Sequence, residues 1–260
     1  MTAARSNLSL VRVQVRSTNR MFWRTPIAAF FTLALPVIFL VLFSVIFGSE
    51  DIAGGYSFSQ FFAPAMAVFA AVSSTFTNLA VRTAFAREQG ILKRVRGTPL
   101  PPWIYMAGII GSGVWIALLS VVLMFILGWA FFGFQMVWDD IGLVVLVFVV
   151  GIATFSALGL AVCSIIKNAD AAPAVANGVF LPMAFISGIF IPLDEAPRWL
   201  VILGDVFPLK HFAEPFSDAF NPLHTGQVLG WENIAIMGAW LLFGALIVTR
   251  FFSWDPRGAK

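Results

Sequence analysis

Residues 87–103 read "REQGILKRVRGTPLPPW", and a long apolar run lies on each side of this charged stretch. Five of its first ten residues are ionised, and prolines follow at positions 99, 101 and 102. The whole chain is 60% hydrophobic and only 11% charged, whereas a soluble domain carries about a quarter charged residues. We therefore interpret the stretch as a loop that joins two membrane-crossing helices.

Six apolar runs are long enough to cross a membrane, because about 20 helical residues span roughly 30 Å of hydrocarbon. The runs cover residues 27–47, 58–81, 103–132, 141–166, 171–193 and 229–249. The alternation typical of a membrane β-barrel is not seen, so the sequence predicts an all-α integral membrane protein. Prolines at positions 36, 64, 173 and 182 predict kinked or broken helices.

The sequence divides into a basic segment, residues 1–26, and a single transmembrane domain, residues 27–260. The apolar run after residue 26 is too long for the core of a cleavable signal peptide, so we expect it to remain as the first crossing.

The segments between the apolar runs alternate in charge. With six crossings, 14 of the 16 Lys and Arg residues fall on the side that holds both termini and residues 87–103. Lys and Arg gather on the cytoplasmic side of membrane proteins. The sequence therefore predicts a multi-pass protein of the plasma (inner) membrane with cytoplasmic termini.

Two further segments favour amphipathic helices. Arg12, Arg16, Arg20 and Arg24 recur every fourth residue, on a different face from Leu8, Val11, Val15 and Phe22. This pattern predicts a helix that lies flat on the inner leaflet, and a solvated basic tail is the alternative. Residues 194–228 predict short extracytoplasmic helices at the outer surface, stopped by Pro208 and Pro215. There, His211 and Glu214 are expected to form a surface pair rather than a metal site.

Catalytic motifs are missing from the sequence. It contains no GxxxxGK[ST], GxSxG or HExxH pattern, and the single cysteine, Cys163, is expected to be a small apolar residue. We expect no catalytic residue, metal site or cofactor in this chain, and no nucleic-acid partner.

The cores of the six runs also hold no Asp, Glu, Lys, Arg or His, which argues against a carrier coupled to protons or ions. The energy for transport is then expected to come from outside the bilayer. A facilitator for a neutral solute and a structural subunit or receptor remain the alternatives.

A polar cluster and several phenylalanines in the second run suggest a path for a hydrophobic or amphipathic solute. Helix packing accounts for such polar residues equally well. The candidate path residues are Phe62, Phe69, Ser73, Ser74, Thr77 and Asn78.

The quoted stretch resembles the signature of ABC-2-type transporter permeases, in which a coupling segment joins the second and third helices. Glu88, Gly90, Leu92, Arg94, Thr98 and Pro99 take the places of that signature. A second stretch, "FISGIFIPLDEAPRWLVILGDVFPLKHFAEPF" at residues 185–216, is similar to the family's pattern at the end of the fifth helix. Ser187, Gly188, Pro192, Pro208, Leu209 and His211 carry it. The resemblance extends over nearly the whole chain.

The resemblance implies the permease subunit of an ATP-driven exporter, similar to drug and antibiotic exporters of the daunorubicin-resistance kind. It implies a dimer with a second, same or related permease, and two ATPase chains that bind ATP and Mg below it. The solute would be a drug, polyketide, lipid or glycolipid. We expect Glu88 and Arg94 to make polar contacts with the ATPase, Gly90 to allow a turn, and Thr98 and Pro99 to close a short helix. Arg87 and Leu92 are expected to belong to the same coupling segment.

Overall fold

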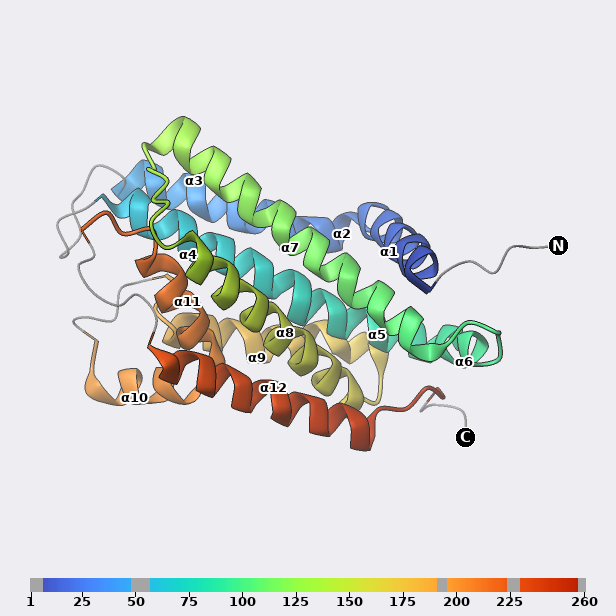
Figure 1. The fold of residues 1–260 in the computed structure, drawn as a ribbon. Coiled ribbons are helices and arrows are strands. Elements are labelled where there is room, and N and C mark those ends of the chain that lie inside the picture. The colour runs from blue at the N-terminus through green and yellow to red at the C-terminus, as the bar shows by residue number, and fades with distance from the viewer. Residues whose placement is uncertain (1–6, 48–56, 191–195, 224–229, 257–260) are drawn as a thin grey trace.

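The computed structural model describes residues 7–47, 57–190, 196–223 and 230–256. These residues form helices and no β-strand, and six helices are long and apolar enough to cross a membrane. The predicted all-α class with six crossings is confirmed (Figure 1).

The described residues form six crossings and several shorter helices. The crossings are α2–η1–α3 (Pro26–Ala29, Phe30–Ala34, Leu35–Phe47), α4–η2–α5 (Phe58–Val72, Ser73–Thr77, Asn78–Glu88), α7 (Pro102–Phe132), α8 (Ile141–Ile165), η3–α9 (Ala169–Ala171, Ala172–Ile186) and α12 (Trp231–Phe251). The remaining helices are α1 (Asn7–Trp23), α6 (Ile91–Arg96), α10 (Arg198–Val206) and α11 (Pro208–Asp218).

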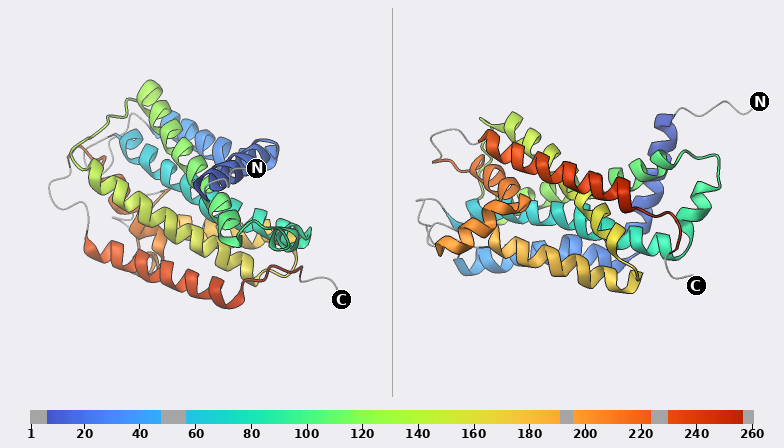
Figure 2. Two further views of the ribbon diagram at one scale, coloured as in Figure 1. Left: turned by 45° about the vertical axis from the view of Figure 1, so that its right-hand side comes forward. Right: turned by 90° about the horizontal axis from the view of Figure 1, so that it is seen from below.

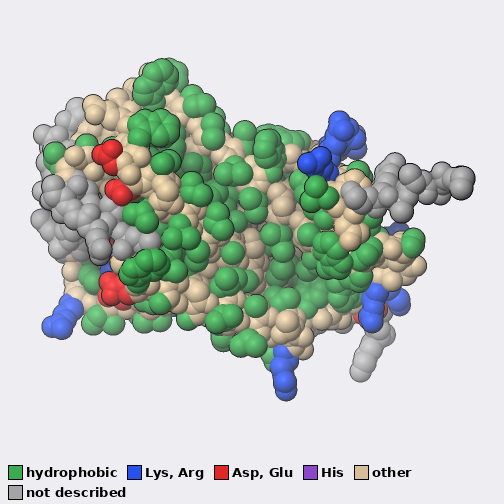
Figure 3. Space-filling model, viewed as in Figure 1, with side chains coloured by type: hydrophobic (Ala, Val, Ile, Leu, Met, Phe, Trp, Pro, Cys, Tyr) green, Lys and Arg blue, Asp and Glu red, His purple; other side chains and the backbone are tan. Residues whose placement is uncertain are grey.

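The second crossing is the central helix of the bundle. In its most apolar window 89% of the residues are buried, against 11% in α12. It packs against α3, α7, α8, α9 and α11. Aromatic rings fill much of the space, as where the ring centroids of Phe69 and Phe180 lie 4.8 Å apart. The outer helices turn apolar side chains outward, and Figure 3 shows these covering the middle of the molecule. Such a surface suits a lipid environment.

The two ends of the bundle differ in the helices that they carry. α1, α6 and the end of α12 lie together at one end, and α10 and α11 lie at the other (Figure 1). Seen from below, α1 runs across the long helices rather than along them (Figure 2). The helix predicted over residues 5–24 is therefore present as Asn7–Trp23, and its place at the membrane surface stays a prediction.

Two predicted helix ends were wrong. The second crossing continues seven residues beyond Val81, to Glu88. Its charged residues are accommodated because the Arg82 guanidinium donates to the Thr18 carbonyl at 3.0 Å and Arg87 also binds carbonyls of the chain. The fifth crossing, predicted to end at residue 193, ends at Ile186, and Gly188 follows in the left-handed conformation with φ of 79°. Residues 191–193 lie outside the described part.

Two crossings contain one turn of π-helix each, and these turns touch. η1 immediately precedes α3, whose second residue is Pro36. η2 lies in the middle of the second crossing, and its Ser73 hydroxyl is 3.5 Å from the Phe31 carbonyl of η1. This contact lies in the middle of the bundle. π-turns inside α-helices often occur at functional sites, so the two turns mark a candidate functional position there.

The outer helices differ from expectation in part. α10 ends at Val206, just before Pro208 as expected, and Pro208 also begins α11, since the missing N–H of a first-turn proline would be unpaired anyway. Pro215 lies inside α11, and this helix buries Leu209, Phe212 and Phe216. The helix therefore packs an apolar face into the core, and its position on the extracytoplasmic side stays a prediction.

Candidate coupling site

A glycine turn sets the short helix α6 at an angle to the central helix. Gly90 has φ of 68° and ψ of 13°, in the left-handed region that favours glycine. The space around it is open, so only the backbone conformation requires this residue. The turn expected at Gly90 is present.

α6 packs on the bundle through apolar residues, chiefly Leu92, and presents its basic residues outward. Leu92 is fully buried in a cluster with Tyr105 and Ile109 of α7. Lys93, Arg94 and Arg96 are exposed. The resulting surface is basic and lies at the end of the bundle that the charge distribution assigns to the cytoplasm.

Local hydrogen bonds define the end of α6. The Thr98 hydroxyl donates to the Val95 carbonyl at 2.7 Å, and the Leu100 N–H donates to the Thr98 hydroxyl at 3.3 Å. Pro99 lies within this turn and Pro102 begins α7. Arg94 folds back, with its Nη2 3.0 Å from the Gln89 carbonyl.

Arg87 binds the end of α8 from the central helix. Its side chain is only 2% exposed. Nη1 donates to the Cys163 carbonyl at 2.9 Å, and Nη2 donates to the Ile166 carbonyl. The last carbonyls of a helix lack partners within the helix and carry partial negative charge, so a guanidinium is well suited to this position.

Glu88 binds the start of the next crossing. One carboxylate oxygen accepts the Ala169 N–H at 2.8 Å, where η3 and α9 begin. An anion is favourable at that end of a helix. Together, Arg87 and Glu88 with the carbonyls of Cys163 and Ile166 and the N–H of Ala169 form what we call the Arg87–Glu88 clamp. It ties the helix next to α6 to the connection between the fourth and fifth crossings.

The clamp contributes partners that the sequence analysis missed. Three residues, Cys163, Ile166 and Ala169, take part through backbone atoms. Every residue type has these atoms, so the sequence does not reveal this role. The polar break "KNAD" at residues 167–170 was the only available signal. Glu88 itself is an exposed residue, so its predicted contact with an ATPase is compatible with the bond to Ala169 and stays a prediction.

The candidate path residues lie in or near η2, inside the bundle. Phe62 and Phe69 are buried among other rings. Ser74 donates to the Ala71 and Gly113 carbonyls at 2.8 and 3.2 Å, as the helix-packing interpretation expects. Thr77 differs, since its hydroxyl oxygen is buried and has no hydrogen-bond partner within the described residues. Asn78 is buried next to it.

The second motif ends in a buried histidine. His211 is 6% exposed, with Nδ1 2.6 Å from Asn233 Oδ1 and Nε2 2.8 Å from the Asp205 carbonyl. The prediction of a surface pair with Glu214 was wrong, because both ring nitrogens have partners inside the fold and Glu214 is exposed.

The other residues of this motif lie around the end of α9. Ser187 Oγ donates to the Ala184 carbonyl at 3.0 Å. Leu209 is fully buried. Pro192 lies outside the described residues.

Six apolar helices, of which the second is largely buried among the others, with charged connections at the ends, define a multi-pass membrane protein. The sequence model of the ABC-2 type transporter family matches residues 9–221, and the chain belongs to this family.

Named relatives agree with this assignment. The chain is 27% identical over 222 residues to the transport permease YvfS of Bacillus subtilis, covering 83% of this chain and 86% of that one. It is 26% identical over 224 residues to the inner membrane transport permease YadH of Escherichia coli, covering 84% and 82%. The daunorubicin resistance ABC transporter permease protein DrrB1 of Streptomyces coeruleorubidus is 25% identical over 213 residues, covering 76% and 73%. The chain is thus a membrane transport permease.

Proposed function

We propose that this permease is the membrane subunit of an ATP-driven exporter in the plasma membrane, with both termini in the cytoplasm. One observation carries the proposal: α6 presents exposed Lys93, Arg94 and Arg96 beside a clamp that joins three crossings. A basic surface of this kind suits docking to a soluble ATPase. ATP and Mg would bind to two copies of that ATPase, and a second permease, same or related, would complete a dimer.

The clamp provides a route for the movement. A push on α6 acts on α5 through Gly90 and on α7 through Leu92. Through Arg87 and Glu88 it also acts on the ends of α8 and α9. Four crossings would then respond to one contact with the ATPase, which suits a switch between inward and outward access.

The proposed solute is hydrophobic or amphipathic, such as a drug, polyketide, lipid or glycolipid. The phenylalanine-rich interior around Phe62 and Phe69 supports this. The buried hydroxyl of Thr77 would offer one polar contact to such a solute. The name of DrrB1, which refers to daunorubicin resistance, supports a drug of that kind and outward transport.

Transport into inverted membrane vesicles tests the proposal. Vesicles that contain the permease and its co-purifying ATPase should take up daunorubicin, or another compound of a hydrophobic panel, only when ATP and Mg are supplied. Uptake that proceeds equally without the ATPase would instead identify a facilitator. Uptake confined to hydrophilic sugars or ions would contradict the proposed solute class.

A further inference from the structure

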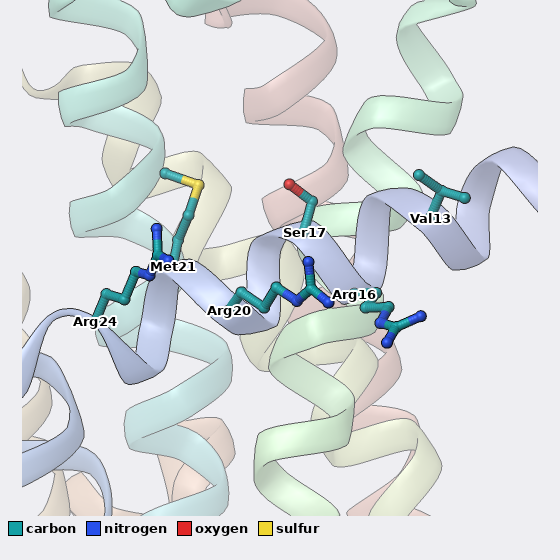
Figure 4. A pocket seen from close by; sticks show the side chains of 6 residues that line it. All are labelled: Val13, Arg16, Ser17, Arg20, Met21 and Arg24. Atoms are coloured by element: carbon teal, nitrogen blue, oxygen red, sulfur yellow. The ribbon is translucent and has the colours of Figure 1, made fainter.

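Three arginines of α1 line a hollow on the surface of the molecule. Arg16, Arg20 and Arg24 lie on successive turns, and Val13, Ser17 and Met21 complete the lining (Figure 4). The hollow measures about 540 Å³, and all six of these residues are exposed.

These arginines lack an acidic counterpart. The first acidic residue of the chain is Glu50, and within the described residues the salt bridges include none to Arg16, Arg20 or Arg24. Like charges one helical turn apart destabilise a helix. The site therefore favours an anion that several guanidinium groups share.

The opposite face of α1 is fixed to the bundle. The Thr18 carbonyl accepts from Arg82, and Phe22 is 1% exposed. Gln14 packs so closely on α7 that a Cβ at Gly108 would lie 2.1 Å from its Cγ. The arginine face is thus presented by an anchored helix in a fixed orientation.

The surroundings of the hollow point to a lipid rather than to a free anion. α1 runs across the crossings (Figure 2), and the first crossing begins three residues after its end. Ile27 at that start is 72% exposed, and Phe30 is 44% exposed. Guanidinium groups that could hold a phosphate therefore lie next to apolar side chains that could contact acyl chains.

We propose that Arg16, Arg20 and Arg24 bind the phosphate of an anionic phospholipid of the cytoplasmic leaflet, with its acyl chains against Met21, Ile27 and Phe30. Only the cytoplasmic assignment rests on the proposed function. The lipid would hold α1 at the membrane surface while the bundle moves.

Binding of a fluorescent phosphatidylglycerol to the purified permease in neutral detergent tests the site. The variant carries Arg16→Gln, Arg20→Gln and Arg24→Gln. The control carries Lys93→Gln, Arg94→Gln and Arg96→Gln on α6, which removes three exposed positive charges from the same side of the molecule. Each basic residue near an anionic lipid contributes about a fivefold factor, so the α1 variant should bind about 100-fold more weakly. The control should change binding by less than about threefold.

Three outcomes overturn the proposal. Equal losses in both variants would mean that only net charge attracts the lipid. Competition by millimolar inorganic phosphate as effective as that by unlabelled phosphatidylglycerol would indicate a free-anion site. Unchanged lipid binding in the α1 variant together with lost ATPase co-purification would identify a protein-docking face. Circular dichroism of both variants confirms that they fold, and transport assays are not needed for this comparison.

Discussion

At the scale of single residues, the Arg87–Glu88 clamp places two opposite charges side by side and uses each at a different helix end. The arginine meets carbonyls at the end of α8, and the glutamate meets an N–H at the start of η3. Each charge matches the dipole of the helix end that it binds. The adjacent pair thereby caps two helix ends, that of α8 and that of η3, from one turn of the central helix.

Replacing Arg87 by Met should lower stability more than replacing Arg94 by Met. Arg87 is buried and loses two charge-assisted hydrogen bonds, a cost of about 3 kcal/mol. Arg94 is exposed and is bonded only to the turn next to it. Thermal denaturation in detergent would measure both. Equal melting temperatures for the two variants would show that the clamp does not hold the helices together.

Glu88→Lys should uncouple ATP hydrolysis from transport, and Glu88→Gln should do so far less. Lysine cannot accept the Ala169 N–H and brings a cation to the positive end of a helix. Glutamine keeps an acceptor oxygen. The measurement is the ratio of solute moved to ATP hydrolysed in vesicles, with membrane insertion checked separately. A normal ratio in Glu88→Lys would leave the stretch with a role in topology alone.

Gly90→Ala should disturb α6, whereas Gly97→Ala should not. Gly90 has φ of 68°, where a Cβ costs about 1 kcal/mol or more even though the space around it is open. Gly97 has φ of −82°, which any residue adopts. Co-purification of the ATPase reports the effect, and the Gly90 variant should retain several-fold less. The prediction would be wrong if both variants retained the same amount.

At the scale of helices, the sequence predicted the crossings well and their ends less well. Hydropathy located all six, because an apolar run of about 20 residues has few other uses. The hydropathy pattern ended the second crossing at Val81, because charged residues follow it. The helix continues because Arg82 and Arg87 bind backbone carbonyls of neighbouring helices. The proline pattern also ended a helix at Pro215, although this residue lies inside α11. These outcomes depend on tertiary contacts that no local pattern contains.

The packing of α1 on α7 should depend on the missing side chain at Gly108. In Gly108→Val the new atoms would collide with Gln14, so α1 should separate from α7. Trypsin would then cut at Arg16 and Arg20 at least tenfold faster than in the parent protein. Val introduced at Gly142, where a Cβ would meet nothing within 4 Å, is the matched control.

At the scale of the whole molecule, residue charge and helix arrangement agree on orientation. The basic α1 and α6 lie at one end of the bundle (Figure 1), and Asp139 and Asp205 belong to connections that the charge pattern assigns to the other side. The six-helix class and the family could both be read from composition and motifs, whereas the orientation stays a prediction. The choice of the second crossing as the central helix could not, since its mean hydropathy of 1.4 is lower than that of most of the others.

Cysteine labelling of intact cells tests the orientation. In a Cys163→Ala background, single cysteines at Asp139 and Asp205 should react with a membrane-impermeant maleimide. One at Arg96 should react only after the membrane is opened. All three positions are exposed in the structure, so differences in reaction report the side of the membrane. Labelling at Arg96 in intact cells would reverse the orientation and remove the basis for docking at α6.

The clamp also joins segments that are synthesised at different times. Arg87 is synthesised 76 residues before Cys163, and Glu88 81 residues before Ala169. A ribosome that adds about 5–20 residues per second needs about 4–16 s to produce the later partners. During that interval the final partners of Arg87 and Glu88 do not yet exist. The helix at the centre of the finished bundle can therefore complete these hydrogen bonds only after the fourth crossing and the start of the fifth have been synthesised.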